Sequence, residues 1–232
     1  MMKQANMISN KLQKTFAAVD DYINSHLVPP DPALDAARSA SAAAGLPDIA
    51  VTPSQGKLLY LLARSVNAHH ILEIGTLGAY STIWLARALP ADGRLVTLEF
   101  SPKHIEVARK NIARAGLSEK VELREGPALE TLPEIAAEGL APFDFIFIDA
   151  DKENNAGYFE WALKLSRPGS FIFIDNVIRD GKVADAKTKE PMVLGVRRLN
   201  ELLAKETRVI ATTIQTVGSK GYDGFTLVLV IS

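Results

Sequence analysis

The sequence predicts an α/β fold built on a doubly wound, mostly parallel sheet of seven strands, with N-terminal helices before it and an antiparallel hairpin at its C-terminal end. From about residue 70 onward, short apolar runs alternate with segments of helical periodicity. Several of these runs are almost continuously apolar, as is typical of strands that are buried on both faces of a parallel sheet. Because no repeat, low-complexity tract or linker interrupts the chain, we expect one domain over 1–232, with 1–50 as a helical extension.

The N-terminal extension should contain two helices. Residues 8–27, starting with Ile8, place apolar side chains at spacings of three and four, which predicts an amphipathic helix. The prolines of VPPDP end this helix, because consecutive prolines cannot continue it. An alanine-rich helix then begins at Asp31 or at the proline after it, and Gly45 suits its C-cap. These helices could cover the sheet, form a lid over a site or build a dimer interface, and the sequence does not choose among these roles.

The rest of the chain follows the strand–helix alternation. A third helix is expected over 51–66, with Thr52 or Ser54 as its N-cap. The expected parallel strands are 70–75, 94–99, 120–125, 143–149 and 170–175. The helices between and after them are 79–89, 102–115, 128–138, 153–166 and 191–205. The runs 207–217 and 224–232 flank GSKGYDG, which predicts the antiparallel hairpin.

The composition is that of an ordinary enzyme or binding domain. Hydrophobic residues make up 47% and charged residues 23%, and a net charge of −1 gives no general attraction to nucleic acid or anionic membranes. The absence of cysteine excludes disulfides, thiolate metal sites and a cysteine nucleophile. No apolar run approaches the ~18 residues of a membrane span, and the N-terminus lacks the apolar core of a signal peptide. We therefore expect a cytoplasmic protein without a membrane partner.

The first strand, turn and helix, Ile71 to Leu89, form the candidate cofactor site. Gly75 can adopt a positive φ and lets a ligand approach the backbone closely. The helix N-terminus behind it offers unpaired N–H groups to an anion. The turn Gly75-Thr76-Leu77-Gly78 lacks the second glycine of the dinucleotide pattern G-x-G-x-x-G.

Two acidic residues at strand ends favour a cationic cofactor. Glu73 precedes the turn, where a carboxylate would repel a pyrophosphate, whereas S-adenosylmethionine carries an ammonium, a sulfonium and only one carboxylate. Glu99 ends the second strand 24 positions after Gly75, about the spacing at which Rossmann-type folds bind ribose hydroxyls. These residues favour S-adenosylmethionine, while NAD and a plain turn with two surface acids remain alternatives.

Oxygen-bearing side chains also end the fourth and fifth strands, at the edge of the sheet where parallel folds bind ligands. Asp149 follows the fourth strand, and Asp175 and Asn176 end the fifth. Three such oxygens suit Mg²⁺, Mn²⁺ or Ca²⁺, with positions left for water or a bidentate substrate. An Asx turn at Asp175-Asn176 is the alternative. The histidines lie on helices or at the opposite edge and are interpreted as structural, namely His26, His69, His70 and His104.

Lys152 follows Asp149 by three residues, at the start of a helix. A lysine in the first turn of a helix is unfavourable for the macrodipole, which suggests a role other than helix stability. Near a metal and in a partly dry pocket, its pKa would fall and it could accept a proton. A solvated lysine is the alternative.

Four motifs in this order resemble a known family: LEIGTLGAYS, LVTLE, FIDADKENNAGYF and FIDNVIRDGKVAD. They are similar to those of the class I S-adenosylmethionine- and metal-dependent O-methyltransferases. This family includes the caffeoyl-CoA O-methyltransferases and, more distantly, catechol O-methyltransferase. The resemblance covers about 50–232 and suggests a bacterial member, and IDADK followed by IDN is its most specific part.

The resemblance implies a role for individual residues. The implied S-adenosylmethionine contacts are Val51, Glu73, Gly75, Ser81, Glu99, Ala128 and Asp149. The implied metal ligands, for Mg²⁺ first and Mn²⁺ or Ca²⁺ as alternatives, are Asp149, Asp175 and Asn176. Lys152 matches the lysine proposed as general base and is expected to act together with Asp149. Plant members usually carry aspartate in place of Glu99, but either carboxylate can bind a ribose.

The implied reaction moves the methyl group of S-adenosylmethionine to a hydroxyl of a catechol-like or hydroxycinnamoyl small molecule, a vicinal diol chelated by the metal. The segment after Asn176 and the KGYDGF turn do not match the substrate-specificity regions of the plant enzymes. The resemblance therefore does not imply which substrate this protein uses. One alternative is methylation of 5-hydroxyuridine at the tRNA wobble position, with phosphates meeting Arg179, Lys182, Lys187 and Lys189. Another is a non-catalytic S-adenosylmethionine-binding protein. Relatives of this kind are usually homodimers, so a homodimer is expected.

Overall fold

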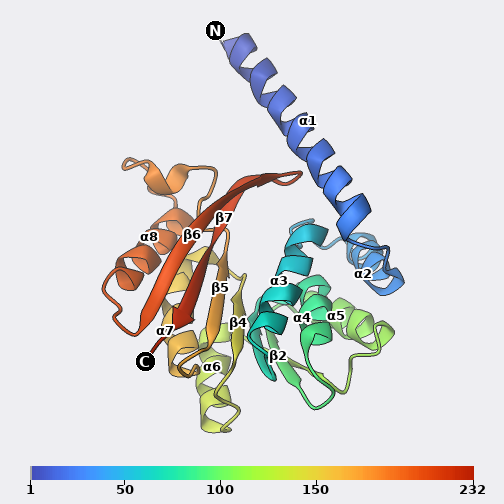
Figure 1. Cartoon of the computed structure of the whole chain (residues 1–232), viewed down its shortest axis with the longest axis vertical. Helices are drawn as coiled ribbons and strands as arrows, with labels where there is room; N and C mark the ends of the chain where they lie inside the picture. The colour runs from blue at the N-terminus through green and yellow to red at the C-terminus, as the bar shows by residue number, and fades with distance from the viewer. Residues whose placement is uncertain (1) are drawn as a thin grey trace.

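A mixed sheet forms the centre of the molecule (Figure 1), and the computed structural model describes residues 2–232, with side chains from residue 10 onward. The seven strands lie in the order β3-β2-β1-β4-β5-β7-β6. Their bounds are β1 (His70–Ile74), β2 (Arg94–Glu99), β3 (Val121–Glu125), β4 (Phe145–Ile148), β5 (Phe171–Asp175), β6 (Val209–Gly218) and β7 (Gly221–Val230). The first five pair in parallel, and β7 pairs antiparallel with both β5 and β6. This confirms the predicted doubly wound, mostly parallel sheet with its C-terminal hairpin.

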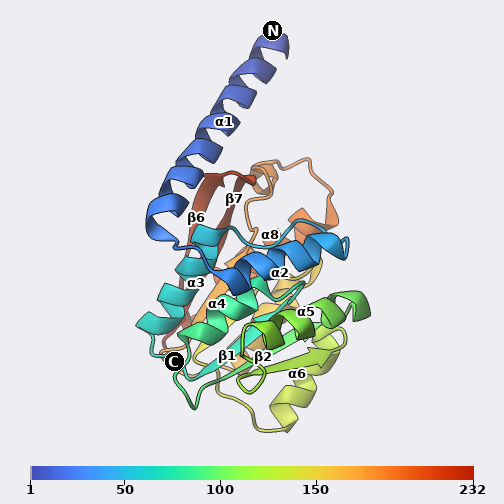
Figure 2. The same ribbon diagram turned by 90° about the vertical axis from the view of Figure 1, so that its right-hand side faces the viewer.

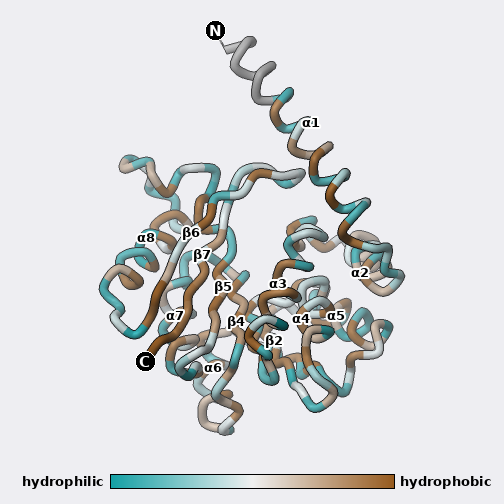
Figure 3. Tube along the Cα trace, in the orientation of Figure 1, coloured by the Kyte–Doolittle hydropathy of each residue, from teal (hydrophilic) through white to brown (hydrophobic). Residues whose placement is uncertain are grey.

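Helices cover both faces of the sheet. One face packs against α2 (Pro32–Ala43), α3 (Pro53–Ser65), α4 (Tyr80–Ala88) and α5 (Pro102–Arg114). The other packs against α6 (Ala128–Ala137), α7 (Asn155–Lys164) and α8 (Pro191–Leu203). Successive strand residues alternate between the two cores, so Phe145 and Phe147 face the first and Ile146 and Ile148 the second. Figure 2 shows α2, α4 and α5 on the near side of the sheet, and Figure 3 shows hydrophobic residues concentrated along its central strands.

The N-terminal helices agree with the prediction, although the first is longer than expected. Helix α1 (Met2–Leu27) begins six residues before the predicted start at residue 8. It projects away from the sheet (Figure 1), and the side chain of Ile8 lies outside the described residues. Asp31 caps α2 by accepting the backbone N–H groups of Ala33 and Leu34. No helix in the described chain is both long enough and apolar enough to cross a bilayer.

Two local predictions differ from the structure. The predicted turn of the hairpin at 218–224 is too long, because the ladder continues to the pair Gly218–Gly221 and leaves only two residues in the turn. The predicted helix 153–166 is preceded by a separate turn of 3₁₀ helix, Lys152–Asn154, and α7 starts at Asn155. Both differences arise from pairing and packing that local periodicity does not encode.

Candidate active site

A cavity of about 1180 Å³ opens at the carboxyl edge of the parallel strands. Its wall is formed by residues that follow β1 to β5, together with parts of α2 and the segment before α3. The predicted site residues on this wall are Val51, Gly75, Ser81, Glu99, Ala128, Asp149, Lys152 and Asn176. Glu73 and Asp175 are almost fully buried and lie behind the wall. One cavity therefore brings the predicted cofactor residues and the predicted metal ligands together.

Gly75 adopts φ +102°, as the sequence predicts, and no other residue type would fit there. A Cβ atom at this position would overlap the backbone carbonyl of Asp149 on the neighbouring strand. Because the turn packs directly on the backbone after β4, residues that follow β1 and β4 are neighbours in the cavity wall. Gly78 has a similar steric role, since a Cβ there would overlap Oγ of Ser41 in α2.

Glu73 is fully buried at the end of β1 and accepts hydrogen bonds from three hydroxyls. These donors are Oγ of Ser81 at 2.6 Å, Oγ1 of Thr82 at 2.5 Å and Oγ1 of Thr97 at 2.7 Å. Burial raises the pKa of Glu73 to about 7 although the three hydroxyls oppose that shift. The carboxylate thereby orients Ser81 on the cavity wall, and its own contact with a cofactor stays a prediction.

Glu99 is fixed on the cavity wall at the end of β2, next to β1. Its carboxylate accepts the backbone N–H groups of Leu77 at 2.8 Å, Phe100 at 3.1 Å and Ser101 at 3.0 Å. Nδ1 of His104 lies 3.3 Å from the same carboxylate, so the interpretation of this histidine as purely structural missed a residue of the cavity wall. Phe100 was also missed, and this residue of the wall is 71% exposed. The only signal in the sequence was its position directly after Glu99, whereas its exposure, which marks a surface that a ligand can cover, comes from the structure.

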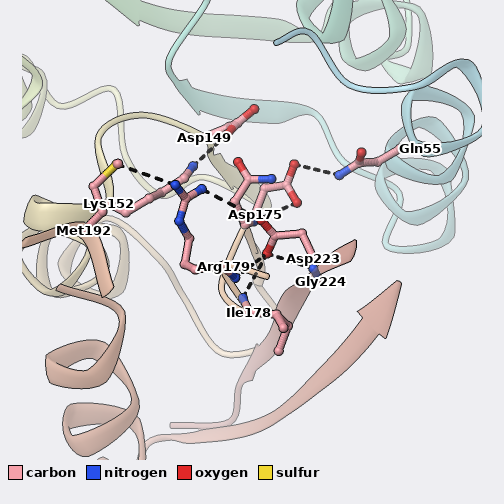
Figure 4. Close-up of polar contacts among 10 residues, drawn as sticks. Gln55, Asp149, Lys152, Asp175, Ile178, Arg179, Met192, Asp223 and Gly224 are labelled. Carbon is pink, nitrogen blue, oxygen red and sulfur yellow. Dashed lines mark hydrogen bonds and ion pairs between the residues drawn. The ribbon is translucent and has the colours of Figure 1, made fainter. Parts of the chain in front are cut away.

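Two of the predicted metal ligands, Asp149 and Asp175, lie near each other at the ends of β4 and β5 (Figure 4), and Asn176 directly follows Asp175. Oδ2 of Asp175 accepts a hydrogen bond from Nε2 of Gln55 at 2.7 Å, and Oδ1 accepts one from the backbone N–H of Asn176 at 2.9 Å. Burial, and then repulsion from Asp149, raise the pKa of Asp175 to about 7. Asn176 is in the left-handed region at φ +56°, which asparagine tolerates better than most residues.

Two mutually repelling carboxylates beside an amide oxygen are a donor set that fits a hard divalent cation. Within residues 2–232 no group of three or more His, Cys, Asp or Glu side chains is arranged to hold a metal. The predicted set therefore depends on the amide oxygen of Asn176 as its third protein ligand. It stays a prediction.

Lys152 is held against Asp149, with Nζ 2.7 Å from Oδ1. Only 5% of the residue is exposed, so the alternative of a solvated lysine is wrong. Gly195 of α8 packs so tightly on this turn that a Cβ there would overlap the backbone carbonyl of Lys152. The ammonium group is thus fixed at the metal-ligand end of the cavity.

Two further residues of the site were missed because their partners are distant in sequence. Gln55 in α3 contacts Asp175, 120 positions later. Oδ1 of Asp223 in β7 accepts the N–H groups of Ile178 at 2.9 Å, Arg179 at 3.0 Å and Gly224 at 3.0 Å. Asp223 thereby connects the loop after Asn176 to the hairpin. These are the two segments that differ from the plant enzymes in sequence.

Comparisons with known proteins point to one family. A family model described as O-methyltransferase matches residues 25–231. A protein from Niastella koreensis named catechol O-methyltransferase is 56% identical over 215 residues, which cover 93% of this chain and 97% of that protein. A protein of the same name from Mycobacterium tuberculosis is 53% identical over 212 residues, which cover 91% of this chain and 94% of that protein.

Solved structures give the same result. The O-methyltransferase from Bacillus cereus in complex with SAH has a TM-score of 0.93 and 56% identity, and the match covers 94% of this chain and 99% of that chain. The O-methyltransferase TomG from Streptomyces achromogenes, involved in tomaymycin synthesis and solved in complex with SAM, has a TM-score of 0.92 and 52% identity, with 95% of this chain and 99% of that chain covered.

Proposed function

The chain belongs to the O-methyltransferase family and is an S-adenosylmethionine-dependent O-methyltransferase, and from this premise we propose that its acceptor is a catechol-like vicinal diol held by a divalent metal. The observation that carries the proposal is the cavity itself. Its wall holds Gly75, Ser81 and Glu99 on the side of β1 and β2 and Asp149, Lys152 and Asn176 on the adjoining side of β4 and β5. Two reactants bound to these two sides would meet in one cavity.

The first side suits the cofactor. The carboxylate of Glu99 is already oriented by three backbone N–H groups, and its Oε2 atom, which accepts only that of Leu77, keeps a lone pair for a ribose hydroxyl. Val51, Gly75 and Ala128 supply close backbone approaches, and Ser81 supplies a hydroxyl that Glu73 orients. S-adenosylmethionine supplies an electrophilic methyl group on a cationic sulfur when it is bound here.

The second side suits the acceptor. Asp149, Asp175 and Asn176 would hold the metal, and Mg²⁺ is favoured because the three ligands are oxygens. A divalent cation held there supplies positive charge that lowers the pKa of an adjacent substrate hydroxyl. In its neutral amine form, with a divalent cation beside it, Nζ of Lys152, oriented by Asp149, would accept the proton from that hydroxyl. Binding both reactants in one cavity would align the oxygen nucleophile with the methyl group, which converts an encounter between two molecules into a step within one complex.

The proposal is tested with purified protein, S-adenosylmethionine, Mg²⁺ and a panel of caffeic acid, its CoA ester, catechol and simple flavonoids. We expect methylation of a vicinal diol that EDTA abolishes and added Mg²⁺ restores. Asp175→Asn should lower turnover by at least about 100-fold, since removing a metal ligand weakens metal binding strongly. The Kd for S-adenosylhomocysteine should change little in this variant. Glu153→Gln removes an exposed carboxylate next to Lys152 and serves as the matched control. Undiminished turnover of Asp175→Asn in EDTA would contradict the metal assignment.

The same experiment decides between the proposed acceptor and tRNA. The relatives described above give no support to the tRNA alternative. Of the four basic residues that could meet phosphates, Lys182 is paired with Glu190 at 2.7 Å and Arg179 lines the cavity. An arm with undermethylated tRNA is included, and methylation of tRNA without methylation of any diol would replace the acceptor while keeping the residue roles.

A further inference from the structure

Arg179 is a cationic residue of the cavity wall to which the proposed reaction gives no role. It follows the predicted metal ligand Asn176 by three residues, in the loop between β5 and α8. Its own backbone and that of Asp180 adopt φ +55°, which turns the chain sharply. Because Asp223 accepts the N–H of Arg179, the backbone from which the side chain starts is fixed.

The guanidinium group of Arg179, whose side chain is 26% exposed, has only weak partners in the structure. Its Nη1 atom lies 3.8 Å from Oδ2 of Asp223, and its Nη2 atom lies 3.8 Å from Sδ of Met192. Its Nε atom is buried, and no hydrogen-bond partner for it exists within the described chain. A guanidinium carries five N–H donors, and leaving a buried one unpaired costs free energy. The side chain is therefore held in place while much of its hydrogen-bonding capacity is unused.

Other basic residues of this loop region are engaged elsewhere. Lys182 pairs with Glu190, and Nε of Arg197 donates to the carbonyl of Val183 at 3.0 Å. Lys152 belongs to the cavity wall, but its ammonium is bound to Asp149. Among the described residues from 176 to 198, Arg179 alone places a positive charge on the cavity wall.

We propose that Arg179 binds a carboxylate of the acceptor, so that the enzyme prefers vicinal diols carrying an acidic substituent. This rests on the proposed function, because the acceptor is the same diol held at Asp149, Asp175 and Asn176. A planar carboxylate can accept two parallel N–H groups from a guanidinium, an arrangement that an alcohol cannot reproduce. An ammonium substituent would meet a like charge, which selects against amines.

The placement of Arg179 agrees with an acceptor that lies along the wall of the cavity. Asn176 and Arg179 belong to the same loop and line the same cavity, so an acceptor bound at the first can extend toward the second. Figure 4 shows the Arg179 side chain extending into the region between Lys152, Met192 and Asp175. Met192, Leu129 and Tyr158 add apolar surface to the wall, which suits an aromatic ring between the two polar ends.

The test measures kcat/KM for matched substrates that differ only in the charge of the side group. The substrates are 3,4-dihydroxybenzoate and 3-(3,4-dihydroxyphenyl)propanoate, with the alcohol and the amine of each length. The proteins are wild type, Arg179→Gln, Arg179→Lys and the control Lys187→Gln, which removes an exposed charge from the same loop outside the cavity. Each variant is compared with wild type on the same substrate, so intrinsic reactivity differences cancel.

We expect Arg179→Gln to lower kcat/KM for a carboxylate substrate by about 10- to 100-fold, mainly through KM, as loss of a hydrogen bond to a charged group does. The alcohol should change by less than about 3-fold, and the amine should improve. Arg179→Lys should fall between wild type and Arg179→Gln, because it keeps the charge and loses the paired donors. Lys187→Gln should behave as wild type.

Other outcomes overturn the inference. An equal loss for acid, alcohol and amine would mean that Arg179 only supports the loop, and no loss for either acid would mean that it does not bind the substituent. Suppose that one of these two results appears while wild type methylates the alcohols and EDTA abolishes that activity. Then the inference on Arg179 fails and the proposed function stands. If wild type methylates none of the diols, the proposed function fails and the inference fails with it.

Discussion

At the scale of single residues, Glu73 shows how burial and hydrogen bonding compete within one carboxyl group. Burial raises its pKa from the ordinary value of 4.5 to about 7, although three hydroxyl donors favour the charged form. The folded protein therefore holds this proton more tightly than the unfolded chain does. The contribution of Glu73 to stability is fully present below about pH 4.5 and is lost as the pH rises through about 7.

This sign leads to a prediction for Glu73→Gln. As the pH rises from 5 to 8, the free energy of unfolding of wild type should fall by about 2–4 kcal/mol relative to that of the variant. Each unit of pKa shift corresponds to about 1.4 kcal/mol. In the variant an amide NH₂ replaces one oxygen that accepts from the hydroxyls, which changes the free energy of unfolding by the same amount at every pH. The test is therefore the change with pH of the difference between variant and wild type. Urea unfolding at pH 5, 6.5 and 8 measures it, with the exposed Glu153→Gln as control. A difference between Glu73→Gln and wild type that stays constant with pH would show that Glu73 ionises normally.

Gln55 acts on the site through Asp175. Its Nε2 group donates to Oδ2 of this buried carboxylate at 2.7 Å and so fixes its orientation. We predict that Gln55→Leu weakens binding of Mn²⁺ or Mg²⁺ by about 10-fold, as loss of a partner behind a metal ligand does. Calorimetric titration of the protein with Mn²⁺ in the presence of S-adenosylhomocysteine measures this directly. Gln13→Leu, on α1, is the control, and equal Mn²⁺ affinities of Gln55→Leu and wild type would remove Gln55 from the site.

At the scale of elements, the hairpin β6–β7 controls the loop that follows β5. Oδ1 of Asp223 accepts three backbone N–H groups, two of them from this loop. Asp223→Ala should leave these donors unsatisfied and lower the free energy of unfolding by about 1–3 kcal/mol. It should also speed amide exchange over 176–181. Asp223→Asn keeps an acceptor oxygen and should retain most of the stability. Hydrogen exchange and thermal unfolding distinguish the two variants, and identical behaviour would mean that the oxygen at this position does not anchor the loop.

The elements themselves were predictable because their signals are local. Apolar runs identified the strands. The helix expected to start at Asp31 or Pro32 is capped by Asp31, and of the two N-cap candidates Thr52 and Ser54 the structure uses Thr52. Parallel strands bring their carboxyl ends to one edge, so Glu99, Asp149 and Asn176 could be assigned to that edge from the sequence alone, and all three line the cavity. Gln55, His104 and Asp223 could not be assigned, because their roles depend on contacts between elements that one sequence does not reveal.

At the scale of the whole molecule, two exposed apolar surfaces lie on elements at its periphery. Helix α1 projects from the body (Figure 1) and exposes an apolar stripe of Leu12, Val19, Tyr22 and Leu27. Strand β6 is an edge of the sheet, and Ile210 and Ile214 are exposed on the same face of it. Exposed apolar surfaces on a helix and on a sheet edge are typical of interfaces. Because the net charge is only −1, two copies of the chain repel each other little.

We propose that these two surfaces, the α1 stripe and the exposed face of β6, form the interface of a homodimer. Val19→Glu and Ile214→Glu should each convert the protein from twice the mass of the chain to the mass of one chain, because a charge buried in an apolar interface without a partner costs several kcal/mol. Size-exclusion chromatography with light scattering, at micromolar protein concentration, measures this. Leu61→Glu places the same charge at an exposed apolar position of α3 outside both surfaces and should leave the mass unchanged. A wild-type protein with the mass of a single chain would contradict the dimer. A dimer that survives both Val19→Glu and Ile214→Glu would mean that the copies associate through another surface.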